Sequence, residues 1–186
     1  KGAPAAYTPV GITATNEAVS DFFKEELFCH GHTYAYHPLA ASAISAAISE
    51  FKKLAATGQM ETTARHLKEQ LYKLADKHVC IGDVRGIGHF WALEIVKNRE
   101  TKEPFDVKAD KLSGKALMTG KIVAEAMANG VYMAAWYDTL VIAPPLIITE
   151  AEIDEGIAVL DTALKIGDAE ALDTGVPASR SAEFSR

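Results

Sequence analysis

The sequence has few cysteines, no long apolar run and no excess of basic residues. Only two of its 186 residues are cysteine, Cys29 and Cys80, and they form no CxxC pair or other metal-ligand spacing. Two isolated cysteines favour a reducing, cytoplasmic compartment over a disulfide scaffold. The formal net charge of -6 leaves no basic face for phosphate backbones, so nucleic acid is excluded as an expected partner. No apolar stretch is long enough to cross a bilayer, so no membrane association is expected.

The first residue is Lys1, and an initiator methionine is lacking. This start predicts a processed or excised piece of a longer polypeptide. With 48% hydrophobic and 24% charged residues, the chain has the composition of a globular protein. Its length is sufficient for one good core or two small ones.

The first third of the chain is predicted to hold one short strand, over 10–14, and two helices. A short helix over 17–27 should place its phenylalanines on one face. The stretch 28–37 is aromatic, histidine-rich and too irregular for a simple amphipathic element. Pro38 occupies a first-turn position and starts a helix over 39–54. Its many alanines and serines predict close packing on most faces, hence a buried helix.

From about residue 55 onward the pattern is α+β. The last predicted helix has the clearest start, because Thr149 and Glu152 form a capping box. The tail after Asp168 is polar and is predicted to be loosely held. In order, the expected elements are a helix over 60–78, a β-hairpin from 79–81 and 84–96, a helix over 115–129, strands at 131–133 and 140–143, and a helix over 149–166.

Four segments carry a family resemblance: residues 1–11 (KGAPAAYTPVG), 30–38 (HGHTYAYHP), 84–94 (VRGIGHFWALE) and 140–149 (LVIAPPLIIT). In this order and spacing they resemble the C-terminal half of the class III, or omega-amino, aminotransferases, which use pyridoxal 5'-phosphate. Each segment alone is a weak signal, and the four together are a strong one. The stretch 96–104 (VKNRETKEP) is most similar to the taurine-aminotransferase branch.

The resemblance implies an α/β fold, the C-terminal part of a fold-type I pyridoxal-phosphate-dependent transferase. Residues 1–54 would end the large cofactor-binding domain and include a connecting helix. Residues 55–168 would form the small α+β domain, and residues 169–186 a tail. The family's upstream half supplies the phosphate cup, the ring stacked on the cofactor and the aspartate on its pyridine nitrogen. The expected partners are therefore that upstream half, as a separate chain or missing segment, and a second copy in a homodimer with shared active sites.

By the same resemblance, Lys1 is the catalytic and cofactor-binding lysine, which forms a Schiff base with pyridoxal phosphate. A primary amine can condense with the aldehyde, be displaced by the substrate amine and then move a proton. Judged alone, a terminal lysine is an ordinary solvated charge, and the downstream segments reverse that interpretation. The implied reaction moves an amino group from an omega-amine, amino acid or taurine-like donor to pyruvate or another 2-oxo acid.

In the family, the residue matching Thr33 binds the cofactor phosphate of the neighbouring subunit through its hydroxyl and backbone. These groups can donate hydrogen bonds to a phosphate without adding charge. His32, next to Thr33, is also assigned to the cofactor site. His30, His32 and His37 are expected at the dimer interface. No metal site is predicted from their H-x-H spacing, because the run lacks an acidic partner.

The chain departs from the family at residues 133–138, where many omega-transaminases carry an arginine that binds the substrate carboxylate. Here Ala134, Ala135 and Trp136 stand instead, which puts carboxylate recognition by that route in doubt. Arg85, just before the hairpin, is predicted to make a structural salt bridge or a domain contact. Two alternatives to an aminotransferase stay open: a class III aminomutase, racemase or decarboxylase, and a non-catalytic α+β interaction domain.

Overall fold

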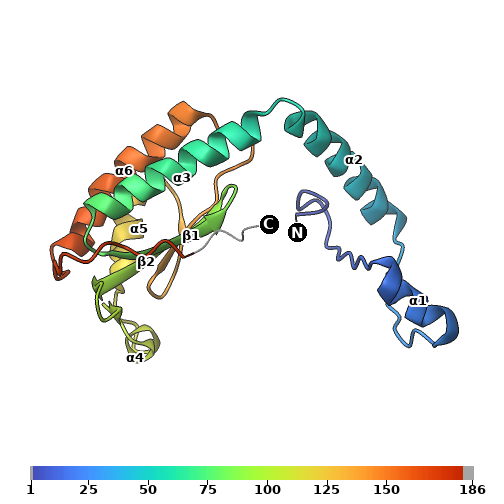
Figure 1. Cartoon of the computed structure of the whole chain (residues 1–186), viewed down its shortest axis with the longest axis horizontal. Helices are drawn as coiled ribbons and strands as arrows, with labels where there is room; N and C mark the ends of the chain where they lie inside the picture. The colour runs from blue at the N-terminus through green and yellow to red at the C-terminus, as the bar shows by residue number, and fades with distance from the viewer. Residues whose placement is uncertain (1, 182–186) are drawn as a thin grey trace. The chain divides into compact units, whose positions relative to one another are not determined.

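The computed structural model describes residues 2–181, apart from the side chains of Lys108 and Lys111. The chain divides into two compact units, an N-terminal unit (Lys1–Thr57) and a C-terminal unit (Gly58–Arg186). In Figure 1 the first is blue to teal, and the second runs from green to red.

Two helices make up the regular structure of the N-terminal unit, α1 (Glu17–Glu25) and α2 (Pro38–Ala55). Both were predicted. Asn16 starts α1, because its side-chain oxygen accepts a hydrogen bond of 3.0 Å from the Val19 N–H. The predicted strand at 10–14 is wrong: that stretch has no regular structure. A strand needs a neighbour for its peptide groups, and the described part of this unit contains no sheet.

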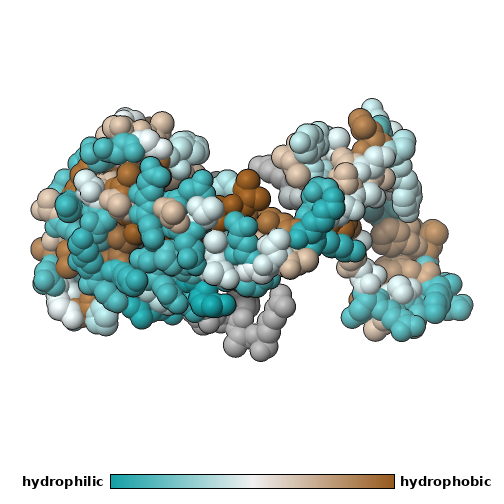
Figure 2. Space-filling view, turned by 90° about the horizontal axis from the view of Figure 1, so that it is seen from above, coloured by the Kyte–Doolittle hydropathy of each residue, from teal (hydrophilic) through white to brown (hydrophobic). Residues whose placement is uncertain are grey.

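Helix α2 forms as predicted, but the prediction that it is buried is wrong for this chain. Of its residues only Ala40 is buried, and Leu39, Ile48 and Phe51 are between 46% and 64% exposed. The alanines and serines make a helix that can be packed closely. The described residues do not supply the side chains that would cover it. Figure 2 shows hydrophobic residues, in brown, on the visible surface of this unit.

The C-terminal unit is built on an antiparallel sheet in the order β1-β2-β5-β4, with β3 paired to the end of β2. The predicted hairpin is confirmed, and Gly86 of β1 allows the two strands to approach closely, because a Cβ there would lie 2.4 Å from the backbone oxygen of Phe90. The strands are β1 (Ile81–Ile87), β2 (Phe90–Asn98), β3 (Glu103–Pro104), β4 (Ala134–Trp136) and β5 (Thr139–Ile142).

Strand β4 lies three residues later than the predicted 131–133. The cause is the end of helix α5 (Met118–Ala128), where Gly130 adopts a φ of 88°. The Gly130 N–H donates to the Met127 oxygen and the Val131 N–H to the Ala126 oxygen, the two bonds of a Schellman motif. Residues 130–131 are therefore used to close the helix and cannot begin a strand.

Helices α3 (Gln59–Lys77) and α6 (Glu150–Asp168) pack side by side; α3 contacts β1, and α6 contacts α5. The short α4 (Lys108–Leu112) lies in the excursion after β3. Both long helices were predicted, and the capping box of Thr149 and Glu152 is present. The predicted apolar stripe of α3 is buried. Side chains from the sheet and the helices form one core, with Leu71, Ile81, Leu93, Ile95, Ile122, Leu140 and Leu164 at most 1% exposed. Burial of each such side chain stabilises the fold by about 1.5–3 kcal/mol.

The prediction of a loosely held tail is wrong for residues 169–181. Ser179 pairs with β1 in parallel: its N–H donates to the Gly82 oxygen, and its oxygen accepts from the Val84 N–H, both at 2.9 Å. Arg180 forms an ion pair of 2.6 Å with Asp76. The physical reason is that β1 is the outer strand of the sheet, so its unpaired peptide groups bind the extended tail.

Candidate functional site

Lys1, the predicted catalytic lysine, lies outside the described residues. The residues that follow it form two tight turns, in which the Ala5 N–H donates to the Gly2 oxygen and the Tyr7 N–H to the Pro4 oxygen. Ala5 and the next alanine have positive φ values of 49° and 64°, a conformation that costs a non-glycine residue about 1–2 kcal/mol. The lysine segment is thus a compact turn rather than an extended loop.

One polar atom of the lysine segment is buried without a partner. The Thr8 hydroxyl oxygen has no hydrogen-bond partner in the described part of the chain. Buried hydroxyls are nearly always hydrogen-bonded in complete proteins, since an unpaired one costs about 1–3 kcal/mol. An additional group is therefore expected to approach this segment.

The structure brings His32 and Thr33, the other two predicted cofactor residues, into one exposed turn. The His32 carbonyl oxygen accepts from the Ala35 N–H at 2.9 Å, and its ring Nδ1 accepts from the Tyr34 N–H at 3.2 Å. The Thr33 side chain is exposed, and no hydrogen bond of its hydroxyl occurs among residues 2–181. The turn therefore presents a hydroxyl donor, while His32 is fixed against its own backbone.

The turn has one side-chain donor that is not used within the described residues. A phosphate oxygen requires donors that are not used internally, and the Thr33 hydroxyl meets that requirement. The engaged Nδ1 of His32 leaves its Nε2 as the ring atom free to face a ligand. The described residues contain no group of three or more His, Cys, Asp or Glu side chains arranged to hold a metal ion.

Arg85 makes the structural salt bridge that was predicted as one of its two roles. Its Nη1 lies 2.8 Å from Asp83 and 2.7 Å from Glu94. The hydrogen bond to Asp83 raises the pKa of the Arg85 guanidinium. Burial alone would raise the pKa of Asp83, but hydrogen bonds from Arg85 and Ser181 hold it below its ordinary value. Arg85 therefore joins β1 to β2, and Asp83 ties the sheet to the tail.

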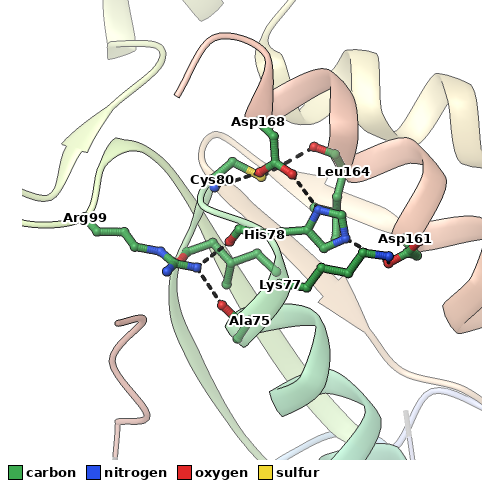
Figure 3. Close-up of polar contacts among 9 residues, drawn as sticks. Ala75, Lys77, His78, Cys80, Arg99, Asp161, Leu164 and Asp168 are labelled. Atoms are coloured by element: carbon green, nitrogen blue, oxygen red, sulfur yellow. Dashed lines mark hydrogen bonds and ion pairs between the residues drawn. The ribbon is translucent and has the colours of Figure 1, made fainter. Parts of the chain in front are cut away.

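A buried polar cluster around His78 was not found by sequence reasoning (Figure 3). His78 Nδ1 lies 2.6 Å from Asp168 and Nε2 lies 3.0 Å from Asp161, and the whole residue is only 1% exposed. Lys77 pairs with Asp161 at 2.5 Å, and the Cys80 N–H donates to Asp168 at 3.0 Å. The two aspartates are seven residues apart and therefore lie on one face of α6. This spacing is the sequence signal from which part of the cluster could have been predicted.

This cluster, the His78 lock, joins the end of α3 and the start of β1 to α6 through hydrogen bonds and an ion pair. The hydrogen bond from Lys77 lowers the pKa of Asp161. Burial would raise the pKa of Asp168, yet hydrogen bonds from His78 and the Cys80 N–H hold it below its ordinary value. Burial raises the pKa of the Cys80 thiol far above its ordinary range, so this thiol is not a nucleophile.

Arg99 completes the lock at the end of α3. Its Nη2 donates to the carbonyl oxygens of Ala75 (2.6 Å) and His78, and its Nε donates to the Ile81 oxygen at 2.8 Å. The last carbonyls of a helix have no partner inside the helix, so the guanidinium supplies one. This part of the site is structural.

Comparison with known proteins identifies the family. The model of the aminotransferase class-III family matches residues 4–164. Putrescine–pyruvate aminotransferase of Pseudomonas aeruginosa is 34% identical over 83% of this chain and 32% of its own length. Taurine–pyruvate aminotransferase of Rhodobacter capsulatus is 33% identical over 89% of this chain and 37% of its own length.

Solved structures agree with the sequence relatives. The taurine:2-oxoglutarate aminotransferase of Bifidobacterium kashiwanohense, solved with pyridoxal phosphate and glutamate, matches with a TM-score of 0.69 and 30% identity over 84% of this chain and 34% of that one. A transaminase from the marine bacterium Virgibacillus matches with a TM-score of 0.74 and 26% identity. The match covers 91% of this chain and 38% of that one.

The chain belongs to the class III aminotransferase family, whose enzymes use pyridoxal phosphate. Its fold is part of the fold-type I aminotransferase fold, as predicted. It spans about a third of the length of the relatives that it matches. No helix among residues 2–181 is long and apolar enough to cross a membrane.

Proposed function

We propose that this chain brings the cofactor-carrying lysine, Lys1, to an aminotransferase that transfers an amino group to pyruvate or another 2-oxo acid. The observation that carries the proposal is the family match over residues 4–164, which begins three residues after Lys1. The rest of the site would come from the two thirds of such an enzyme that this chain does not span. A homodimer would place the Thr33 turn of one subunit at the cofactor phosphate of the other.

Pyridoxal phosphate, when bound, supplies an aldehyde for the substrate amine and an electron sink for the carbon that loses its proton. In the proposed site the Lys1 Nζ accepts that proton and returns it to a neighbouring carbon. The Thr33 hydroxyl donates a hydrogen bond to the phosphate, and His32 lies beside it in the same turn. No charge is needed from either residue, because a phosphate is well held by hydroxyl and peptide donors.

We further propose that the amino donor lacks a carboxylate next to its amine. Strand β4 presents Ala134, Ala135 and Trp136, so it offers no cation to a carboxylate. The names of two relatives give putrescine, a diamine, and taurine, a sulfonate, as their donors. Putrescine has no anionic group and so fits a site without the carboxylate-binding arginine, and taurine has no carboxylate next to its amine.

The central test joins this chain to the remaining part of the enzyme, as one polypeptide or as a co-expressed second chain. Borohydride reduction in the presence of pyridoxal phosphate should leave a covalent adduct on Lys1, located by mass spectrometry. The Lys24→Ala variant, which alters an exposed lysine of α1, should keep the adduct and Lys1→Ala should lose it. An adduct on another lysine, or none, would overturn the assignment.

Activity separates the aminotransferase from a mutase, racemase or decarboxylase. Alanine should form from pyruvate when putrescine or taurine is the donor. The rate with an α-amino acid donor, whose carboxylate lies next to its amine, should be lower. Absence of alanine with every donor, despite an adduct on Lys1, would favour the other reaction classes.

The phosphate role of Thr33 is tested by a pair of variants. Thr33→Ala should weaken pyridoxal phosphate binding by about tenfold, the equivalent of one hydrogen bond to a charged group. Thr33→Ser keeps the hydroxyl and should bind nearly as well as the parent. Equal affinity of both variants would contradict the role.

A further inference from the structure

The two edges of the C-terminal sheet differ. At one edge, β1 is covered by the tail through the hydrogen bonds of Ser179. At the other edge, β4 pairs only with β5 among the described residues. An uncovered strand edge presents unpaired N–H and C=O groups that can pair with another extended segment.

An apolar groove of about 640 Å³ lies where β4 begins and β5 ends, and Ala134 is the residue of β4 that lines it. It is bounded by residues 129–134, which lead into β4, by residues 141–145 at the end of β5, and by one face of α6. Leu67, Ile153 and Leu160, each at most 3% exposed, line it, so the groove reaches the edge of the core. A strand that pairs with β4 could place alternate apolar side chains into this groove.

The charges along the groove are acidic. Among its described lining residues the charged ones are Glu152 and Glu155. Glu152 is engaged in the capping box of α6, whereas Glu155 is exposed and has no ion-pair partner within residues 2–181. The groove therefore suits an extended apolar segment that carries a lysine or arginine opposite Glu155. A second copy of this chain would bring an equally acidic groove to the same edge.

We propose that the β4 edge and its groove bind an extended segment from the part of the aminotransferase that this chain does not span. The relatives contain about two thirds of their length outside the matched region, which is ample for such a segment. The inference rests on the proposed function only in that the enzyme has this additional part. The bound segment would add a strand to the sheet at β4, as the tail does at β1.

Gly156 provides a direct way to fill the groove. It lies within α6 and lines the groove, and a Cβ there would meet no atom within 4 Å. Gly156→Leu therefore blocks the groove without a clash in this chain, and it raises helix propensity. Gly120→Leu is the matched control, because Gly120 lies in α5, is exposed, is outside the groove and is equally open.

The measurement is hydrogen–deuterium exchange of the amides of 134–136 in this chain alone and in the chain joined to the remaining part of the enzyme. Joining should slow exchange at β4 by at least about tenfold, the equivalent of a modest local stabilisation. Gly156→Leu should remove most of that protection in the joined enzyme, and Gly120→Leu should retain it.

Equal exchange with and without the remaining part would overturn the proposal, as would full protection in the Gly156→Leu enzyme. Protection of β4 in the chain alone that rises with protein concentration would overturn it in favour of a second copy. Exchange does not depend on turnover. A protected β4 in an enzyme that forms no alanine would therefore reject the proposed function and leave this inference standing.

Discussion

Helices α2 and α6 are almost equal in length, 18 and 19 residues, but differ in what surrounds them. Helix α6 buries five residues, while α2 buries only Ala40. Both begin with clear local signals, Pro38 in one and the Thr149 capping box in the other. The comparison teaches that local signals determine where a helix forms, whereas the stability of the unit depends on the partners that cover it.

The strongest test of this contrast is to separate the two units. Residues 58–186 alone should melt cooperatively within about 4 °C of the whole chain, equivalent to about 1 kcal/mol, because the core lies in this unit. Residues 1–57 alone should show little helix by circular dichroism, since short helices without tertiary contacts are marginal in water. Stable helix in the 1–57 piece would contradict the contrast.

The next effect is expected from truncating one apolar side chain in each unit. Leu71→Ala removes a side chain that is 0% exposed and should lower the free energy of unfolding by about 3 kcal/mol. Phe51→Ala removes a larger side chain that is 51% exposed and should change it by less than about 0.5 kcal/mol. Urea titration followed by the fluorescence of buried Trp91 measures both. Comparable losses would show that α2 is covered.

The His78 lock should make the C-terminal unit sensitive to acid. The pKa of Asp168 is lowered in the folded state, so its contribution is present above its ordinary value of 3.8 and is lost as pH falls below it. Asp168→Asn should cost about 2 kcal/mol at pH 7, because His78 and the Cys80 N–H lose a charged acceptor. The cost should shrink towards pH 3.

The control is Asp154→Asn, on the same helix but with a side chain that is 56% exposed. It should change the free energy of unfolding by less than about 0.5 kcal/mol, as for most surface ion pairs. Urea titrations at several pH values measure both variants. A cost for Asp168→Asn that is the same at pH 7 and pH 3 would exclude the charge of Asp168 as its cause.

The smallest effect is expected from the helix caps. Thr149→Ala removes the cap of α6 and should destabilise the C-terminal unit by about 1 kcal/mol. Asn16→Ala removes the corresponding cap of α1, but the cooperative melt should not move, because α1 buries no residue. Thermal melts of the two variants make the comparison. A shift of equal size in both would show that the two units unfold together.

Much of the fold was predictable because its signals are local. The leucine stripe of α3, the capping box of α6 and the glycine turn of the β1–β2 hairpin depend on neighbouring residues. The misplacement of β4 arose because residues 130–131 close α5 by backbone hydrogen bonds that leave little trace in the pattern. The predicted strand at 10–14 failed since a strand depends on a neighbour.

The features that were missed depend on contacts between distant residues. His78 meets Asp161 and Asp168 across 83 and 90 positions, so spacing reveals the two aspartates but not their partner. The tail was predicted to be loosely held because its composition is polar, yet the Ser179 N–H donates a hydrogen bond to the Gly82 oxygen. For the candidate site, the turn of His32 and Thr33 could be assigned only through the family resemblance, because an exposed hydroxyl carries no signal of its own.

The pairing of β1 with the tail has a consequence for biosynthesis. Gly82 and Ser179 are separated by 97 positions, so β1 leaves the ribosome well before the segment that covers it. At typical rates of about 5–20 residues per second, that edge stays open for about 5–20 seconds. An open strand edge on a nascent chain is a site for wrong pairing with a neighbouring chain. Fast translation of the codons between Gly82 and Ser179, or a chaperone bound at β1, would therefore improve the yield of folded protein.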